Sequence, residues 1–299
     1  MRALTLPLAV VAAGAAGLGW SLAEARAFTV RRFTLPVLPA GALPLRVLQV
    51  SDIHLVPRQR AKAAWVKGLA ALQPDLVVST GDTLAAVDAV PAALDAHACL
   101  LELPGVFVLG SNDYYAPVLK NPAGYFVPKD SGRPVLAPRL PTADLVRGLQ
   151  QGGWHNLSNA RAKLTVRGLC LEFVGVDDPH LDRDHYRRVA GPRDPQADLM
   201  IGVTHAPYRR VLDAMVADEA GLIIAGHTHG GQLCLPGVGA LVTNCDLPRC
   251  QAKGVSRWPS GDPDGALLHV SAGIGTSPFT PVRFACRPEA SLLTLVPRR

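Results

Sequence analysis

Short apolar runs that end in polar residues, each followed by an amphipathic segment, repeat along most of the chain. The runs are four to six residues long, rich in β-branched side chains and apolar on both faces, which predicts strands in a sheet covered by helices. The expected strands are 45–50, 76–80, 106–109, 171–176, 199–203, 222–225 and 267–271. Helices are expected over about 59–72, in the Ala-rich stretch up to about 103, and from Pro207 through Met215.

Six of these strand ends carry Asp, Asn or His. In open α/β sheets the ligand site lies beyond the carboxyl ends of the strands, so we expect these side chains to converge on one site. They are Asp52, His54, Asp82, Asn112, Asp113, Asp177, Asp178, His180, His205, His227 and His229.

The heptapeptide Gly226–Gln232, with the letters GHTHGGQ, directly follows the apolar run 222–225. Two imidazoles two residues apart can direct their ring nitrogens into one small volume, and the flanking glycines let the backbone approach a ligand closely. The alternative is a turn with two solvated histidines. Matching carboxylates elsewhere in the chain decide between the two interpretations.

The composition describes a globular protein, with 48% hydrophobic and 18% charged residues. A net charge of +6 fits an anionic partner or an Arg-rich soluble protein. The sequence contains no run of five or six basic residues, which argues against nucleic acid as a dedicated partner. Of the six cysteines, only Cys245 and Cys250 are close enough in sequence to suggest a pair. Buried free thiols are the simpler expectation for a chain of this size.

The N-terminal stretch from Ala3 to Leu22 contains no charged residue. Twenty residues at 1.5 Å each can cross a bilayer core of about 30 Å, so an uncleaved single-pass anchor is expected; a signal peptide cleaved after 25–27 is the alternative. Arg26, Arg31 and Arg32 follow the span, which favours a cytoplasmic domain by the positive-inside rule. Residues 29–44 then read as an edge strand and a Pro-rich connector.

Residues 114–141 break the repeating pattern with six prolines. The segment begins directly after Asn112-Asp113 and carries tyrosines with lysines and arginines, so we expect it to cover the site and to suit an anionic substrate with an apolar part. A solvated surface loop is the alternative.

The ordered set Asp52-x-His54, Gly81-Asp82, Gly110-Ser111-Asn112-Asp113, His205 and Gly226–His229 resembles the motifs of the calcineurin-like metallophosphoesterases over about residues 46–299. The apolar N-terminus, Pro236, Gly273–Thr276 and Pro281–Arg283 resemble the membrane-associated YkuE/YaeI-type branch. The resemblance implies an α/β fold, a two-sheet β-sandwich flanked by helices.

The resemblance also implies a centre of two divalent metal ions. One would bind Asp52, His54, Asp82 and His229, and the other Asp82 as a bridge, Asn112, His205 and His227. Such a centre binds phosphoryl oxygens and activates water. Oxygen and nitrogen ligands without thiolate suit Mn, Fe or Zn.

The third motif departs from the family pattern G-N-H-[DE]. Without a gap, Ser111 takes the ligand position; a slip of one residue keeps Asn112 as the ligand, which we prefer because an amide oxygen binds a hard cation better than a hydroxyl. Either way the histidine that assists the leaving group is missing, and His180, His155, a bound water or a good leaving group could replace it. With this alignment, Asn112, Asp113 and His205 are the expected catalytic residues.

Four further residues could be functional or structural: Asp178, Arg283, His97 and His269. Arg283 could clamp a phosphate or form a surface ion pair. Asp178, before Pro179, is expected to cap a turn rather than to orient a ligand. His97 and His269 have no partner motif around them and are expected to be structural.

The expected domains are a membrane anchor over 1–22, a connector over 23–45 and a phosphoesterase domain over 46–299. The expected activity is metal-dependent hydrolysis of a phosphoester or phosphoanhydride, on a phosphorylated small-molecule or lipid substrate near a membrane, with no obligate protein partner. A scaffold of the same fold that binds partners without catalysis is the alternative, and the four retained histidine ligands argue against it.

Overall fold

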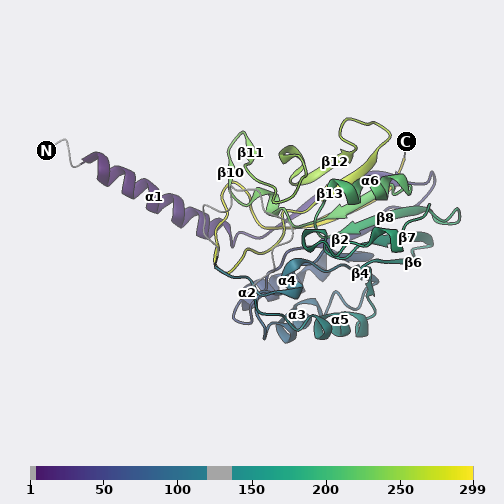
Figure 1. The fold of residues 1–299 in the computed structure, drawn as a ribbon, viewed down its shortest axis with the longest axis horizontal. Helices are drawn as coiled ribbons and strands as arrows, with labels where there is room; N and C mark the ends of the chain where they lie inside the picture. Colours follow the sequence, from purple (N-terminus) through teal and green to yellow (C-terminus); the bar gives the residue numbers. More distant parts are fainter. Residues whose placement is uncertain (1–4, 120–136, 299) are drawn as a thin grey trace.

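The computed structural model describes residues 5–119 and 137–298, and in these ranges two six-stranded sheets pack face to face (Figure 1). The first sheet has the order β1 (Thr29–Leu38), β14 (Glu289–Pro297), β2 (Leu45–Val50), β3 (Leu76–Ser79), β4 (Gly105–Phe107) and β5 (His155–Asn156). The second has the order β12 (Gly254–Trp258), β13 (Ala266–Val270), β9 (Leu222–Ala225), β8 (Leu199–Thr204), β7 (Leu169–Gly175) and β6 (Ala160–Val166).

The inner strands of both sheets are parallel, so their carboxyl ends lie at common edges. β2, β3, β4 and β5 run parallel in the first sheet, and β7, β8, β9 and β13 in the second. Antiparallel strands β6 and β12 close the second sheet, while β14 pairs antiparallel with β2 and parallel with β1. The polar strand ends found in the sequence therefore all follow parallel strands.

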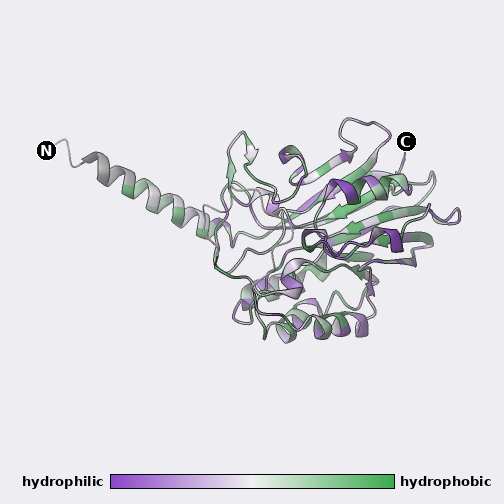
Figure 2. Ribbon diagram, in the orientation of Figure 1, coloured by the Kyte–Doolittle hydropathy of each residue, from purple (hydrophilic) through white to green (hydrophobic). Residues whose placement is uncertain are grey.

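Helices cover the outer face of each sheet. The helices α2 (Arg60–Gly68), α3 (Val90–His97) and α5 (Thr142–Gln151) pack on the first sheet through a buried apolar cluster, and α6 (Arg209–Ala217) packs on the second. A separate apolar cluster fills the space between the sheets, where the strands are strongly hydrophobic (Figure 2). The predicted architecture of two sheets flanked by helices is confirmed.

Several boundaries differ from those expected. The Ala-rich helix expected to reach residue 103 ends at His97, and the helix expected over 59–72 continues beyond Gly68 as a short 3-10 turn. The sequence pattern does not predict β14, although this strand lies between β1 and β2. The edge strand expected within 29–44 is present as β1, which lies at the edge of the first sheet and pairs with β14 along its length.

The membrane span expected over 3–22 is not supported. A helix of 20 residues does form, α1 (Thr5–Glu24), and it extends away from the sheets (Figure 1). Across the described residues, none of the helices combines the length and the apolar character needed to cross a membrane. The last turn of α1 instead packs on the domain, because the Glu24 carboxylate accepts hydrogen bonds from the backbone N–H groups of Ala285 and Cys286, at 3.1 and 2.7 Å.

His269 on β13 is fully buried, and its Nδ1 lies 2.6 Å from Gln49 Oε1 on β2. Burial lowers its pKa to about 3. The His269 ring of the unfolded chain binds a second proton below about pH 6.5, whereas the buried ring of the folded chain does so only near pH 3. The stability associated with the neutral ring is therefore present above pH 6.5. It is lost as the pH falls toward 3, by up to about 1.4 kcal/mol per pH unit.

We therefore expect His269→Asn to flatten the decline in unfolding free energy between pH 6 and pH 4, measured by urea denaturation in the presence of chelator. His185→Asn, at an exposed position, is the matched control and should leave the slope as in the parent. Equal slopes for the parent and His269→Asn would contradict this role for His269.

Candidate metal centre

The loops at the carboxyl ends of the parallel strands hold five of the expected ligands in left-handed backbone conformations. The φ angles are 50° for Asp52, 45° for His54, 54° for Asp82, 70° for His227 and 50° for His229. Such conformations cost of order 1–3 kcal/mol each for residues other than glycine, and they cluster at functional sites. The local backbone is therefore arranged to place these side chains and is compensated by the surrounding fold.

A first group of ligand atoms comes from both sheets. Nε2 of His54 lies 3.2 Å from Nε2 of His229 and 3.3 Å from Oδ2 of Asp82. Nε2 of His229 lies 3.7 Å from Oδ1 of Asp52. The ligand atoms of Asp52, His54 and His229 all lie within 4.8 Å of one another, close enough to bind one ion.

A second group lies on the other side of Asp82. Its Oδ1 is 3.6 Å from Nε2 of His205, which is 3.2 Å from Nδ1 of His227. The Asn112 amide nitrogen lies 3.0 Å from Asp82 Oδ2, so the Asn112 side chain reaches the shared carboxylate. Asp82 thus stands between the two groups, as a bridging carboxylate would.

Buried donors packed this closely fit metal binding better than they fit one another. Two pairs of imidazole nitrogens face each other at 3.2 Å, and Nδ1 of His54 is buried without a hydrogen-bond partner among the residues that the structure describes. Two glycines make room for the donors: a Cβ on Gly110 would lie 2.3 Å from Asp82 Oδ1, and one on Gly226 would lie 2.6 Å from Asp52 Oδ2. The oxygen and nitrogen donor set suits a borderline divalent metal ion.

Backbone carbonyls fix the orientation of two ligand rings. Nδ1 of His205 lies 2.7 Å from the Thr80 carbonyl oxygen, and Nε2 of His227 lies 3.2 Å from the Asn244 carbonyl oxygen. A carbonyl oxygen only accepts, so each of these ring nitrogens carries the proton, and the other nitrogen faces the centre.

The titration of the groups matches ligand chemistry. Burial alone raises the pKa of Asp82, but His205 and His54 outweigh it and hold this pKa below its ordinary value. Burial lowers the pKa of His54 to about 4 and takes those of His227 and His229 well below the ordinary value. At neutral pH the carboxylate is therefore ionised and these three imidazoles are neutral, as metal binding requires.

His205 differs from the other three histidines. Burial lowers its pKa, but the nearby carboxyl groups of Asp82, Asp178 and Asp52 outweigh burial and raise it to about 9. The ring therefore holds an extra proton in the metal-free protein, and that proton leaves when a metal ion binds.

A buried polar chain leads from His269 to Asp52. Gln49 bonds His269 and donates to Thr80 Oγ1 at 3.0 Å; Thr80 Oγ1 donates to Ser51 Oγ at 2.6 Å, and Ser51 Oγ donates to the Asp52 carboxylate. The sequence analysis does not predict this row of hydrogen bonds, because the apolar pattern of a strand does not indicate which polar side chains of the two sheets come into contact.

Asp113, expected among the catalytic residues, has a different environment. It is fully buried, and its two carboxylate oxygens accept hydrogen bonds from the backbone N–H groups of Asp82, Thr83 and Gly110, at 2.8 to 3.0 Å. The Asp113 carboxylate therefore connects the loop that carries Asp82 to the 110–113 motif. Asp113 is therefore a positioning residue rather than a group that faces the reaction.

Arg283 corrects both interpretations offered from the sequence. It is fully buried, so it forms no surface ion pair, and its guanidinium Nη2 donates to the carbonyl oxygens of Ala272, Gly273 and Gly275 at 2.7 to 3.0 Å. The same nitrogen lies 3.2 Å from Nδ1 of His229. Arg283 thus lies behind the His229 ring and binds the backbone of the 272–275 loop instead of clamping a phosphate.

His180 lies next to the centre, whereas His155 lies exposed on edge strand β5. The ring centroid of His180 is 4.6 Å from that of His227, and its Nδ1 is 3.0 Å from the Tyr208 hydroxyl. The Asp178 carboxylate accepts a hydrogen bond from the backbone N–H of His180, so the expected turn cap at Asp178 is confirmed.

An aromatic and cationic wall adjoins His180. The Tyr114 hydroxyl donates to Asp177 at 2.7 Å, and the Arg183 guanidinium carbon lies 4.0 Å from the Tyr114 ring centroid. The two ends of the Pro-rich segment meet beside Tyr114, because the Leu140 N–H donates to the Tyr114 carbonyl. The middle of that segment, with Tyr125 and Phe126, lies outside the described residues.

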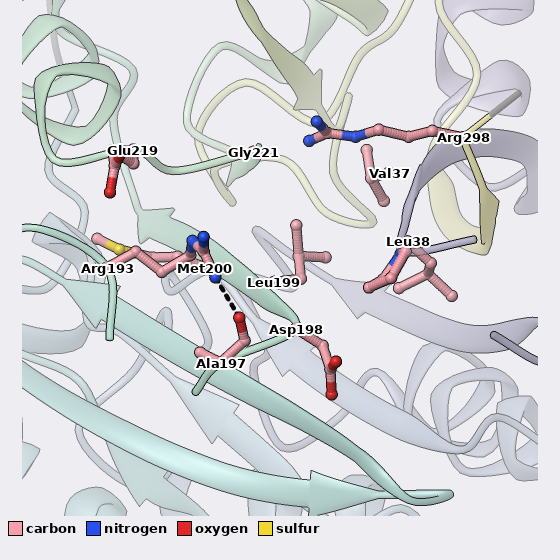
Figure 3. Close-up of a pocket in the computed structure, with 11 residues that line it drawn as sticks. Val37, Leu38, Arg193, Ala197, Asp198, Leu199, Met200, Glu219, Gly221 and Arg298 are labelled. Atoms are coloured by element: carbon pink, nitrogen blue, oxygen red, sulfur yellow. Dashed lines mark hydrogen bonds between the residues drawn. The ribbon is translucent and has the colours of Figure 1, made fainter. Parts of the chain in front are cut away.

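A cavity of about 450 Å³ lies at the opposite edge of the sheets. Figure 3 shows its lining, with Leu199 and Met200 at the start of β8, Gly221 before β9, and Arg298 after β14. The expected ligands follow the carboxyl ends of the same strands, so this cavity is separate from the metal centre.

Two helix-covered sheets, with carboxylates and imidazoles gathered around a shared aspartate, provide candidate ligands for divalent metal ions of the kind that hydrolases use. Residues 45–231 match the family model described as calcineurin-like phosphoesterase, and the chain belongs to this family. It is therefore a hydrolase of phosphate esters or anhydrides, from a family that typically uses a dinuclear divalent metal centre.

Three similar proteins illustrate the relationship. The uncharacterized protein YpbG of Bacillus subtilis (strain 168) is 26% identical over 268 residues, which cover 85% of this chain and 82% of that protein. A Danio rerio transmembrane protein with metallophosphoesterase domain is 26% identical over 278 residues, covering 86% of this chain and 54% of that protein. The structure of the 5'-nucleotidase precursor from Thermus thermophilus aligns with 84% of this chain and 55% of its own, at 14% identity and a TM-score of 0.44.

Proposed function

We propose that this chain hydrolyses a phosphoester or phosphoanhydride at a dinuclear centre bridged by Asp82. The position of Asp82 between the two ligand groups is the observation that carries the proposal. One ion would bind Asp52, His54, Asp82 and His229, and the other Asp82, Asn112, His205 and His227. The Asn112 amide N–H donates to Asp82, which places this side chain beside the shared carboxylate, and its amide oxygen would be the ligand atom of the third motif.

Bound divalent ions would supply charge stabilisation for the phosphoryl group and a water of lowered pKa. Residues of the protein hold the ligands in place. The carbonyl oxygens of Thr80 and Asn244 orient the rings of His205 and His227, and the Ser51 hydroxyl orients the Asp52 carboxylate. The Tyr114–Arg183 wall beside His180 supports an anionic substrate with an aromatic or apolar part. A preference for lipid-linked substrates, a membrane location, manganese as the metal and membership of the YkuE/YaeI-type branch stay predictions from the sequence.

The direct test is hydrolysis of a chromogenic phosphodiester and of a phosphomonoester by the full chain, before and after chelation and with Mn, Fe or Zn restored. Turnover that is lost on chelation and restored by metal supports the proposal. Bound metal without turnover on any soluble ester or on a lipid pyrophosphate would contradict the hydrolase, and a chain that binds no metal would favour a scaffold. Equal rates on lipid pyrophosphates and soluble diesters would remove the lipid preference.

Of the two histidines considered as replacements for the missing family histidine, His180 lies beside the centre and His155 lies exposed on β5, so we expect His180 to assist the leaving group. His180→Asn should slow esters with poor leaving groups, such as phenyl, by roughly 10²-fold, and p-nitrophenyl esters far less. The measurement is kcat against leaving-group pKa. His185→Asn is the matched surface control, and an equal loss on both ester types would show that His180 only supports His227.

A further inference from the structure

Two cysteines lie directly behind the metal-ligand turn that carries His229. Cys234 belongs to the short strand β10 (Cys234–Leu235), and Cys286 lies on the segment that pairs with it. The Cys234 N–H donates to the Phe284 carbonyl at 2.9 Å, and the Phe284 N–H donates to the Gln232 carbonyl at 3.0 Å. Both cysteines are buried, with exposed fractions of 4% for Cys234 and 1% for Cys286, and neither forms a disulfide.

Both thiols bind the same backbone oxygen. The Gly230 carbonyl oxygen lies 3.2 Å from Sγ of Cys234 and 3.6 Å from Sγ of Cys286. The Cys286 thiol also lies 3.3 Å from the His229 carbonyl oxygen.

The backbone places the two cysteines on adjacent segments. Leu233 pairs with Phe284, so Cys234 and Cys286 lie one position out of register. Ala285 has a φ angle of 50°, so the backbone turns between the paired residue and Cys286. Both sulfurs contact the Gly230 carbonyl oxygen and therefore lie close together, as a disulfide requires.

We propose that Cys234 and Cys286 are an oxidative modification site, which hydrogen peroxide converts reversibly into a disulfide that loosens the His229 turn. Because both thiols are buried, the oxidant must be small, which favours a peroxide over a bulky disulfide such as oxidised glutathione. The Lys253 ammonium, 3.5 Å from Sγ of Cys286, stabilises negative charge on that sulfur during attack.

The reaction balances with one equivalent of peroxide. The Cys286 sulfur attacks the O–O bond, which breaks to give a sulfenic acid on Cys286 and one water. The Cys234 sulfur then attacks the Cys286 sulfur, forming the S–S bond and releasing the second water. Two thiols are oxidised, peroxide is reduced to two waters, and a dithiol such as dithiothreitol reverses the change by exchange.

The consequence follows from the hydrogen bonds that are lost. The disulfide has no S–H donor, so the Gly230 carbonyl oxygen loses both thiol contacts, while the His229 carbonyl oxygen loses its thiol contact and keeps the Gln232 N–H at 2.9 Å. This turn is conformationally demanding, since His229, Gly230 and Gly231 have φ angles of 50°, 61° and 89°. Loss of such support weakens metal binding by roughly 10- to 100-fold; this part rests on the proposed metal centre, whereas the disulfide itself does not.

The first test is chemical and needs no variant. The full chain is treated with hydrogen peroxide, remaining thiols are alkylated, and the digest is analysed by mass spectrometry with and without dithiothreitol. The proposal expects one reducible peptide pair joining Cys234 to Cys286, with Cys99, Cys170, Cys245 and Cys250 alkylated. Alkylation of both Cys234 and Cys286 after oxidation, a pairing with any other cysteine, or a sulfinic acid on Cys286 alone would overturn it.

The second test separates the disulfide from its effect. Manganese affinity is measured by competition with a chelating dye for reduced, oxidised and re-reduced protein, with Cys234→Ser as the variant that cannot cross-link and Cys250→Ser as the matched control. Weaker affinity on oxidation in the parent and in Cys250→Ser, reversed by dithiothreitol and absent in Cys234→Ser, supports the proposal. A mapped disulfide with unchanged affinity overturns the coupling to the metal centre, and no metal binding in reduced protein overturns the proposed function instead.

Discussion

Asp82→Asn is expected to lower kcat by roughly 10³-fold or more. A neutral amide cannot bridge two cations as a carboxylate does, and several kcal/mol of charge stabilisation in the transition state depend on the metal pair, each 1.4 kcal/mol being about tenfold in rate. The side chain is almost fully buried and is the closest carboxylate to both His54 and His205. The measurement is kcat on a chromogenic phosphodiester at saturating metal.

Asp95→Asn is the matched control for this substitution. Asp95 forms an exposed ion pair with Lys67 on α2 and is not one of the expected metal ligands. Loss of the Asp95 charge should leave kcat within about a factor of two. The circular dichroism spectrum and melting temperature of Asp82→Asn separate a catalytic loss from unfolding. Activity within about tenfold of the parent in a folded Asp82→Asn would contradict the bridging role.

Arg283→Met is expected to have the second largest effect, on both stability and metal affinity. The substitution leaves the carbonyl oxygens of Ala272 and Gly275 without their donor, at about 1–3 kcal/mol for each buried unsatisfied group, whereas the Gly273 carbonyl oxygen keeps the Glu289 N–H at 2.9 Å. We therefore expect a loss of about 3 kcal/mol or more in unfolding free energy. His229 also loses the partner of its Nδ1, so metal affinity should fall roughly 10- to 100-fold.

Arg283→Lys distinguishes geometry from charge. An ammonium keeps the charge but has no second nitrogen to take the place of Nη1, which lies 3.4 Å from the His229 carbonyl oxygen and 3.5 Å from the Cys286 carbonyl oxygen, so it should recover only part of the stability. Arg287→Met, at an exposed side chain that bonds the Ala27 carbonyl, is the control. If Arg283→Met unfolds at the same urea concentration as the parent, the supporting role is wrong.

The strands and the polar ends of β2, β3, β8 and β9 could be predicted because buried parallel strands are short, apolar and end at the site. The same reasoning missed β14, whose apolar run begins with the buried Glu289 and pairs in opposite senses with its two neighbours. Strand order and direction are set by contacts between distant segments, which local periodicity does not contain.

The ligand side chains could be named from sequence, but the groups that orient them could not. Thr80 and Asn244 contribute carbonyl oxygens, and every residue has one, so no side-chain pattern marks them. The sequence suggests a surface or substrate-facing charge at Arg283 because burial is invisible in sequence. The apolar N-terminus predicts an anchor, whereas the domain contacts of Glu24 depend on residues more than 250 positions away.

The most direct measurement is the metal content of the purified full chain by elemental analysis, compared with Asp82→Asn. A centre bridged by Asp82 predicts two divalent ions per parent chain and at most one in the variant, with both proteins folded. A parent chain that binds one ion or none at saturating metal, or an Asp82→Asn variant that keeps two, would contradict the dinuclear centre on which the proposed function depends.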